Sequence, residues 1–370
     1  MPLAGSDRDE LAAWLRLLAT PGVGPVHARQ LLQQFGPPQT IFETGRAALA
    51  RVAGEPLAAA IRAADPARDA QVESALQWAE APGHHLVTLA DADYPAPLLQ
   101  IGDPPPLLYV VGRRDALTRP MVAVVGSRNA TAAGMGNARA FARSLSGAGF
   151  TLVSGLAIGI DAAAHEGSLA AGAATVAVMG TGADIVYPAA HRDLARRISA
   201  DGALVSELPL GTRPSTGGFP RRNRLIAGLA RGVLVVEAAV QSGSLITARL
   251  AAEFGREVFA IPGSIHSPVA RGCHALIKQG AKLVDGAEDV LSELGVAVSA
   301  IAHSDYSDRP VGHSDPVLAA IGHGPVLPET LAAHLGLSVA ELSARLLELE
   351  LAGSIQRGAD GRITRTPPIG

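Results

Sequence analysis

The sequence is poor in cysteine, lysine and aromatic residues, and each shortage excludes something. Cys273 is the only cysteine, so a disulfide framework and a thiolate metal cluster are both excluded. Aromatic residues make up 4% of the chain, which argues against a surface built from many stacking platforms. Lys278 and Lys282 are the only lysines, so arginine supplies almost all of the positive charge.

The chain also lacks an excess of charge and a long hydrophobic run. Its 370 residues carry a formal net charge of −3 and only 18% are charged, so any anion-binding site must be local. No uninterrupted apolar run reaches about 18 residues, the length of a membrane span. The first residues, MPLAGSDRDELAAW, lack the basic and then apolar pattern of a signal peptide. We therefore expect a cytoplasmic protein without a membrane-spanning segment.

Nucleotide-cofactor motifs are missing as well. The Walker pattern G-x-x-x-x-G-K-[ST] does not occur, and the turn VAVVGSRNATAAGMG carries Arg128 where a dinucleotide fingerprint has its second glycine. The next predicted strand ends in Ser154-Gly155, with no acidic residue to hold a ribose hydroxyl. We therefore expect no nicotinamide, flavin or ATP chemistry and no bound cofactor.

Periodicity divides the chain into four parts. Apolar residues recur at a period near 3.6 in the first part, and apolar runs alternate with helical stretches in the second. A polar stretch without a period then separates these from a small module. We assign a helical domain with a bridge to residues 1–112, an α/β domain to 113–297, a linker to 298–315 and a winged-helix-like module to 316–370.

The second part predicts a parallel sheet. Its strand candidates are apolar without polar alternation, which is typical of strands covered by helices on both faces. This pattern indicates a doubly wound α/β fold, whose ligands bind at the carboxyl ends of the strands. The candidates are MVAVVG (121–126), FTLVSG (150–155), TVAVMG (175–180), ALVSEL (203–208), GVLVVEA (232–238), EVFAIPG (257–263) and KLVD (282–285).

Each flanking module has two interpretations. Two helices around residues 21–24 (PGVG) form a helix-hairpin-helix pattern, whose turn either binds a phosphate or is a plain corner that uses glycine for its φ angles. The last module has three helices and two short strands around an Asp-Gly turn, as in a winged helix, which reads DNA or contacts proteins. Its helix VAELSARLLELE sets three glutamates against Arg345 alone, so this helix is poorly suited to duplex DNA.

The stretch GFPRRNRLIAG (218–228) gathers positive charge where a helix is expected to begin after Pro220. Arg221, Arg222 and Arg224 surround Asn223 in the first turns. Positive side chains there oppose the helix dipole, at a cost of about 0.3 kcal/mol each. The placement is explained if an external anion supplies the negative charge.

Two interpretations of this arginine cluster stay open. Guanidiniums and helix N–H groups can form a phosphate-binding site, with Phe219 available to stack on a base. Alternatively, some of the arginines pair with Glu207 or Glu237, which lie at strand ends of the same sheet.

The turn after the first central strand falls on the same sheet edge. Gly126, Ser127 and Arg128 offer a backbone N–H, a hydroxyl and a guanidinium to an anion at a helix N-terminus. The other interpretation is a helix cap with a solvated arginine. A later helix begins at the same edge with Ser242, Gly243, Ser244 and Thr247, and the hydroxyls of its two serines and its threonine act as caps first and phosphate ligands second.

One pair of residues raises the question of catalysis. Asp161 and His165 are four apart in SGLAIGIDAAAH and share a helical face. They fit a general-base pair of a hydrolase, but no nucleophile or metal ligand stands beside them in the pattern. Local packing, with Asp161 favoured by the helix dipole, is the simpler interpretation.

Taken together, these motifs resemble one family. VAVVGSR, SGLAIGIDAAAH, FPRRNRLIAGLA, VVEAAVQSGSLITARLAAEFGREVFAIPG and GCHALIKQGAKLV occur in the order seen in the DprA (Smf) family of bacterial DNA-processing proteins. The resemblance covers nearly the whole chain. It implies an extended Rossmann-like central domain, a helical N-terminal domain of the SAM or helix-hairpin-helix type and a C-terminal winged helix.

The resemblance also implies a function and a set of site residues. Members bind single-stranded DNA, form homodimers and load RecA onto strands coated by single-strand-binding protein during natural transformation, without being enzymes. Duplex DNA would be bound more weakly. The binding residues implied or inferred here are Gly126, Ser127, Arg128, Arg213, Phe219, Arg221, Arg222, Asn223, Arg224, Ser242, Gly243 and Thr247, with Leu276 and Ile277 at a dimer interface.

Two alternatives belong to other classes. One is a nucleoside-monophosphate hydrolase on a related Rossmann platform, with Glu237 or the Asp161 and His165 pair as catalyst. The other is a scaffold that docks through the module at 316–370. One departure from the family's usual pattern is His274 in GCHALI, where the resemblance leads us to expect asparagine.

Overall fold

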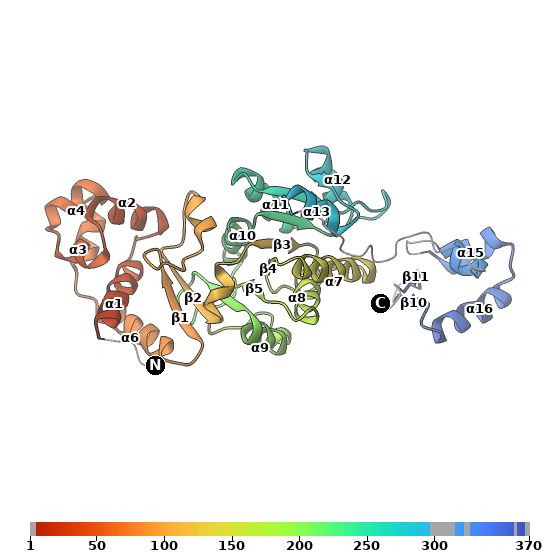
Figure 1. The fold of residues 1–370 in the computed structure, drawn as a ribbon, viewed down its shortest axis with the longest axis horizontal. Coiled ribbons are helices and arrows are strands. Elements are labelled where there is room, and N and C mark those ends of the chain that lie inside the picture. Colours follow the sequence, from red (N-terminus) through yellow and green to blue (C-terminus); the bar gives the residue numbers. More distant parts are fainter. Residues whose placement is uncertain (1–4, 297–314, 322–325, 359–360, 367–370) are drawn as a thin grey trace. The chain divides into compact units, whose positions relative to one another are not determined.

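The computed structural model describes residues 5–296, 315–321, 326–358 and 361–366. The chain divides into two compact units, one of residues 1–130 with 137–295 and the other of residues 131–136 with 296–370 (Figure 1). Apart from Asp315, the predicted linker at 298–315 lies outside the described residues. No helix in the described ranges is long and apolar enough to cross a membrane.

The first unit begins with helices that pack around a core of their own. Gly22, at φ +87°, turns the chain between the first two helices and so forms the predicted helical hairpin. The Asp65 carboxylate caps the last helix by accepting from the N–H groups of Ala67 and Arg68 at 3.0 and 3.1 Å. The helices are α1 (Gly5–Ala19), α2 (Pro25–Phe35), α3 (Pro38–Glu43), α4 (Arg46–Ala53), α5 (Glu55–Arg62) and α6 (Pro66–Ala79).

A nine-stranded sheet lies at the centre of the unit, in the order β1-β2-β6-β5-β4-β3-β7-β8-β9. The strands from β3 to β9 are parallel, and each of them coincides with a predicted apolar run. The strands are β1 (His84–Thr88), β2 (Leu107–Gly112), β3 (Met121–Val125), β4 (Thr151–Ser154), β5 (Thr175–Val178), β6 (Ala203–Ser206), β7 (Gly232–Val235), β8 (Glu257–Ala260) and β9 (Lys282–Leu283).

An antiparallel hairpin extends the sheet beyond what the sequence predicted. β1 pairs with β2, and β2 pairs antiparallel with β6. Both strands fall in the segment that we assigned to the N-terminal domain and its bridge. The proline-rich stretch between them (95–106) has the composition of a loop, and the two short runs beside it carry no turn signal that would pair them.

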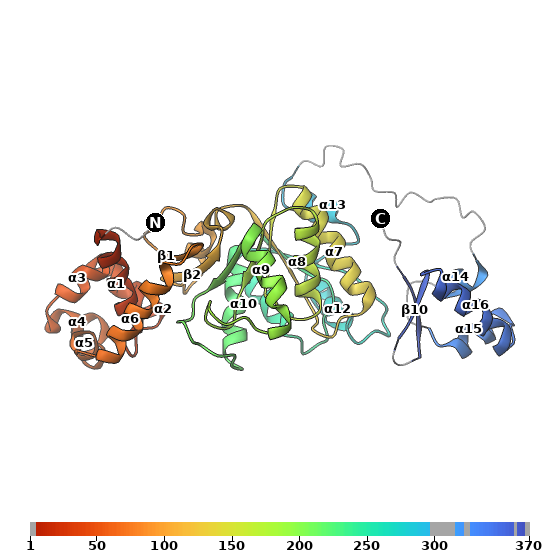
Figure 2. The same cartoon turned by 90° about the horizontal axis from the view of Figure 1, so that it is seen from below.

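Helices cover both faces of the sheet, which confirms the doubly wound α/β fold. Figures 1 and 2 show α7, α8 and α9 over one face and α10, α11 and α12 over the other. Their bounds are α7 (Ala132–Gly147), α8 (Ile160–Ala170), α9 (Arg192–Asp201), α10 (Gly218–Leu229), α11 (Ser244–Glu253), α12 (Arg271–Lys278) and α13 (Ala287–Glu293), with 3-10 turns η1 (Ala96–Gln100), η2 (Arg114–Leu117) and η3 (Ala189–His191). α10 begins at Gly218, so Pro220 lies in its first turn, where the missing N–H breaks no helical bond.

The second unit has the predicted winged-helix arrangement. Three helices pack around Leu331, Leu342, Leu346 and Ile363, and a two-stranded antiparallel sheet follows them. Ser338 and Glu341 form a capping box at the start of the last helix. The elements are α14 (Pro316–Ile321), α15 (Pro328–Leu335), α16 (Val339–Leu351), β10 (Ile355–Arg357) and β11 (Ile363–Arg365).

Candidate functional site

The strand order reverses at β3, because β4 lies on one side of it and β7 on the other. At such a point the turns that follow neighbouring strands diverge and leave a crevice at the carboxyl edge of the sheet. The Ser127 N–H donates to the Glu237 carbonyl at 2.7 Å, which ties the turn after β3 to the turn after β7. Gly126 is required there, since a Cβ would lie 2.6 Å from Ile160 and 2.9 Å from the Glu237 carbonyl oxygen.

This hydrogen bond changes the roles that were predicted for the turn at Gly126, Ser127 and Arg128. The Ser127 N–H is already bonded to Glu237, and the Ser127 hydroxyl accepts from the Asn129 N–H at 3.1 Å. Ser127 itself is buried. The Ser127 N–H is therefore bonded within the fold, while its hydroxyl accepts one bond there and keeps its own proton to donate. Arg128 is the group of this turn that reaches solvent.

The Arg128 guanidinium and the Tyr187 ring both contact the ring of Phe219. The Arg128 guanidinium carbon lies 5.2 Å from the centroid of the Phe219 ring, within cation–π range. On Phe219, the ring of Tyr187 lies at 5.6 Å between centroids and at an interplanar angle of 42°. Tyr187 is 47% exposed, so this Arg128–Phe219–Tyr187 stack faces solvent at the carboxyl ends of β3 and β5 and the start of α10.

Arg222 and Asn223 lie beneath the surface instead of at it. Arg222 is 5% exposed, and its guanidinium donates to the carbonyls of Gly155, which follows β4, and Val178, which ends β5. A Cβ on Gly155 would lie 2.2 Å from Arg222 Nη1, so only glycine admits this side chain. Asn223 accepts from Arg222 Nε and donates to the Gly243 carbonyl, both at 3.2 Å. The two residues predicted to hold DNA therefore join four segments of the fold.

The Asp161 and His165 pair does not form. His165 is fully buried, and its Nδ1 is bonded to the Thr175 hydroxyl at 2.7 Å, while Asp161 accepts from the Ala157 N–H at 3.3 Å. Burial raises the pKa of Asp161, with the nearby Arg222 charge acting against that rise. Burial also lowers the pKa of His165, to about 3. Both residues have the packing role that was the simpler interpretation.

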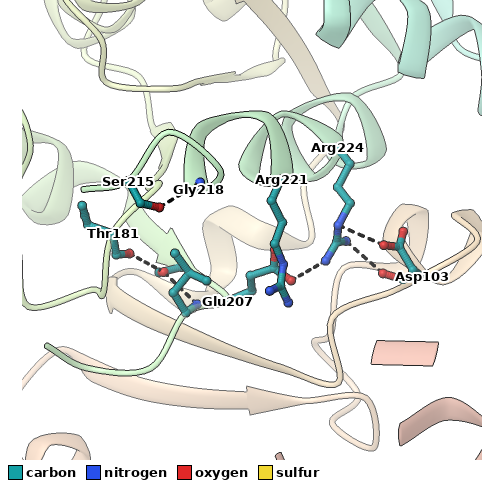
Figure 3. A network of polar contacts seen from close by, with 9 residues as sticks. Asp103, Thr181, Glu207, Ser215, Gly218, Arg221 and Arg224 are labelled. Carbon is teal, nitrogen blue, oxygen red and sulfur yellow. Dashed lines mark hydrogen bonds and ion pairs between the residues drawn. The ribbon is translucent and has the colours of Figure 1, made fainter. Parts of the chain in front are cut away.

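Arg221 and Arg224 turn toward the other side of α10, where Glu207 receives both (Figure 3). Arg221 Nε lies 3.1 Å from Glu207 Oε1, and Arg224 Nη2 pairs with Glu207 Oε2. Arg224 also donates to the Asp103 carbonyl at 2.9 Å and pairs with its carboxylate at 3.2 Å. The pairing with Glu207 proposed from the sequence is thereby confirmed. Burial raises the pKa of Glu207, and the two arginines oppose that rise.

The remaining predicted binding residues differ in how far they are exposed to solvent. Arg213 is exposed on the loop before α10, and Gly243 is exposed at the start of α11. The Ser242 hydroxyl lies 2.7 Å from the Ser244 hydroxyl, within the turn. Thr247 is 1% exposed, because its position on α11 faces the interior. Thr247 therefore does not present its hydroxyl at the crevice.

The residues named for a dimer interface lie on α12. Leu276 is 7% exposed and belongs to the central core, while Ile277 packs against that core from a partly buried position. Leu276 therefore stabilises the fold of the single chain, because its position on α12 faces the sheet. His274 Nε2 lies 3.0 Å from the Gly263 carbonyl, which ties α12 to the loop after β8.

Sequence reasoning missed Tyr187 and Asp103. Tyr187 precedes a proline in the loop after β5, as Phe219 does after β6, and this repeated aromatic-proline pair at strand ends was the available signal. Asp103 lies in the proline-rich stretch that was treated as a bridge. Its contact with Arg224 spans 121 positions of sequence, and no local pattern indicates it.

The fold and the site together define a doubly wound α/β protein with a basic and aromatic cluster at the carboxyl ends of its strands, flanked in sequence by a helical-hairpin module and a winged-helix module. Models of known families match each part: residues 8–75 match the DprA-like N-terminal HHH domain, 85–295 match DNA recombination-mediator protein A, and 310–361 match the DprA winged helix domain. The chain belongs to the DNA recombination-mediator protein A (DprA) family, as its motifs led us to expect.

Individual relatives cover most of the chain. Protein Smf of Escherichia coli K12 is 44% identical over 77% of this chain and 78% of its own length. Protein Smf of Synechocystis sp. PCC 6803 is 34% identical over 96% of this chain and 99% of its own. The crystal structure of DNA processing protein A from Streptococcus pneumoniae superposes with a TM-score of 0.63 at 36% identity, covering 79% of this chain and 99% of that one.

Proposed function

We propose that this protein binds single-stranded DNA at the carboxyl edge of its sheet. The observation that carries the proposal is the exposed Arg128–Phe219–Tyr187 stack at the strand-order reversal. Aromatic rings stack on any base, and a neighbouring guanidinium neutralises a phosphate, so the site suits a strand of any sequence. A relative from Helicobacter pylori, 29% identical with a TM-score of 0.52 over 57% of this chain and 95% of its own, is described as having a single-stranded DNA binding mode.

The same geometry favours single strands over duplex DNA. A base must be unpaired and unstacked before an aromatic side chain can lie against its face. α16, which occupies the recognition position of the winged helix, carries Glu341, Glu348 and Glu350 on exposed positions with Arg345 paired to Glu348. This helix offers little to a duplex phosphate backbone.

We further propose that the protein acts as a recombination mediator in natural transformation and is not an enzyme. In this role a homodimer protects incoming strands and loads a RecA recombinase where single-strand-binding protein would otherwise cover the DNA. Support comes from membership of the recombination-mediator family. Burial of Asp161 and His165, each with its own partner, also argues against the pair that the hydrolase alternative offered, beside Glu237, as its catalyst.

Binding is tested with Arg128→Ala and Phe219→Leu. Loss of the guanidinium is expected to weaken binding of every oligonucleotide alike and to reduce the log–log salt slope by about 0.7, the value for one phosphate on a single strand. Loss of the ring is expected to weaken binding about tenfold with the salt slope unchanged, since stacking carries no charge. Fluorescence anisotropy with labelled oligonucleotides across a salt series measures both.

Arg197→Ala is the matched control, because Arg197 is exposed on α9 and has no ion pair within the described residues. It should leave affinity and salt slope unchanged. The site is wrongly assigned if Arg128→Ala and Phe219→Leu both bind single strands as the unmodified protein does.

The mediator role is tested by RecA loading. On strands already coated with single-strand-binding protein, the full-length protein is expected to restore RecA ATPase activity, and Arg128→Ala is expected to restore less of it at the same concentration. Equal stimulation by both proteins would separate loading from this site. No stimulation by the unmodified protein would contradict the mediator role.

A further inference from the structure

A second concave site lies on the far side of α10 from the aromatic stack. It is a cavity of about 540 Å³, within the range of small-ligand pockets. Its walls come from the helical hairpin (Leu15, Leu18 and Val23), from the proline-rich stretch (Pro105) and from the end of β6 (Leu208). The cavity thus lies between the N-terminal helices and the sheet, inside the first compact unit.

One side of the cavity is charged. Arg224 is held by Glu207 and Asp103, and its side chain is 9% exposed, so its role is to fix the carboxylates. Arg221 differs, because its side chain is 48% exposed and only its Nε is bonded to Glu207. Within the described residues the two terminal nitrogens of Arg221 have no hydrogen-bond partner. Arg221 is therefore a cation that Glu207 orients (Figure 3), and it lines the cavity.

The other side of the mouth also favours an anion. Gly24 and Pro25, which begin α2, line the cavity. The first turn of α2 has no acidic residue, so the partial positive charge of this helix end is not neutralised by its own side chains. The helix end and the Arg221 guanidinium are thus two independent positive groups on one opening, with apolar walls behind them.

α10 connects this cavity to the aromatic stack. Phe219 and Arg221 are two residues apart on α10, so they project from different sides of the helix. A strand that stacks on Phe219 and continues across the start of α10 reaches Arg221 with a neighbouring nucleotide. The cavity offers that nucleotide an apolar space for its base and a guanidinium for its phosphate.

We propose that this cavity is a second nucleotide subsite, which takes one base of the bound single strand while Arg221 holds the adjacent phosphate. The inference rests on the proposed function, since the strand is delivered by the stack on the other side of α10. In the subsite Glu207 is a positioning residue that directs Arg221. The helical hairpin contributes the walls, which gives the N-terminal module a direct part in strand binding.

The test is to fill the cavity from its rim. Gln71 lines the cavity and is exposed on α6, whereas Gln30 is exposed on α2 and does not line it. Gln71→Trp is expected to weaken binding of a long oligonucleotide about tenfold, the worth of one stacked base, and Gln30→Trp to leave it unchanged. Arg221→Ala should also weaken binding and reduce the salt slope by about 0.7. Anisotropy on the full-length proteins measures all three variants.

The outcomes separate this proposal from the proposed function. If Arg128→Ala weakens binding while Gln71→Trp and Arg221→Ala do not, the strand uses the stack alone and the second subsite is overturned. If Arg128→Ala and Phe219→Leu have no effect, the proposed function fails at its own site. A free nucleotide is tested separately with deoxyadenosine monophosphate. If it raises the melting temperature of the unmodified protein and not of Gln71→Trp, while oligonucleotide affinity is the same in both, the cavity serves free nucleotides and the strand assignment is wrong.

Discussion

Arg222→Met is expected to lower the free energy of unfolding by about 2–6 kcal/mol, the cost of leaving two buried carbonyl acceptors unsatisfied at about 1–3 kcal/mol each. The substitution removes a positive charge that opposes the rise in the pKa of the buried Asp161 carboxyl. It also leaves the carbonyls of Gly155 and Val178 without the donor that joins the ends of β4 and β5. Urea unfolding followed by circular dichroism measures the change.

Arg221→Met is the matched control for this prediction. The two arginines are adjacent in α10, but the Arg221 side chain is 48% exposed, so its pair with Glu207 is worth about 0–1 kcal/mol. The double variant Arg222→Met, Asp161→Leu should lose less stability than the sum of the two single variants, because the Arg222 charge acts on Asp161 and each single change removes that same interaction. An Arg222→Met variant as stable as Arg221→Met would show that the Arg222 donors do not hold the ends of β4 and β5 together.

Acid is expected to destabilise the protein through His165. The Thr175 hydroxyl donates to the Leu152 carbonyl at 3.0 Å, so it accepts from His165 Nδ1–H at 2.7 Å, and His165 Nε2 is buried without a hydrogen-bond partner. A proton on Nε2 would be unpaired in the core and close to the Arg222 charge. This is why the folded-state pKa is lowered to about 3, against an ordinary value of 6.5.

The sign of the pH effect follows from this lowered pKa. Above pH 6.5 neither the folded nor the unfolded protein holds a proton on His165, so the group has no effect. Below pH 6.5 the unfolded chain binds a proton that the folded protein refuses, and stability falls by about 1.4 kcal/mol per pH unit until the folded pKa is reached. Between pH 7.5 and 4.5 the loss is therefore about 2.7 kcal/mol.

His165→Leu isolates this contribution. Unfolding free energies of both proteins are measured in urea from pH 7.5 to 4.5, and the difference between them should narrow by about 2.7 kcal/mol as the pH falls. Asp161 and Glu207 have raised pKa values and act in the opposite direction, but both proteins contain them, so they cancel in the difference. Parallel curves would mean that His165 is not held neutral in the core.

The parallel strands could be predicted from the sequence because each buried strand is a short apolar run, and several of these runs end at a glycine. The antiparallel hairpin of β1 and β2 escaped prediction because its partner strand, β6, lies about a hundred positions away along the chain. Pairing between strands so far apart in the sequence produces no local pattern from which it could be predicted. The winged helix was recognisable because its helices and its Asp-Gly turn are adjacent in sequence.

The site was predicted in position but not in detail. The carboxyl edge of the sheet follows from topology, so Arg128 and Phe219 could be placed there from strand order alone. The contacts of the three arginines could not be predicted in this way. Arg221, Arg222 and Arg224 differ only in their angle around α10. Which angle faces the sheet, the Glu207 carboxylate or solvent depends on how the helix is docked. Composition gives the charge of a cluster but not the direction in which each of its side chains points.

The division of the α10 arginines has a kinetic consequence. If the strand binds as proposed, Arg222 and Arg224 contribute no charge to it, because both are bonded inside the protein. Arg128 and Arg221 are then the cations that the two sites offer to phosphates, so the salt slope should be small. In the proposed mediator role, a strand held by few charged contacts would be released to a tighter-binding partner without a large barrier.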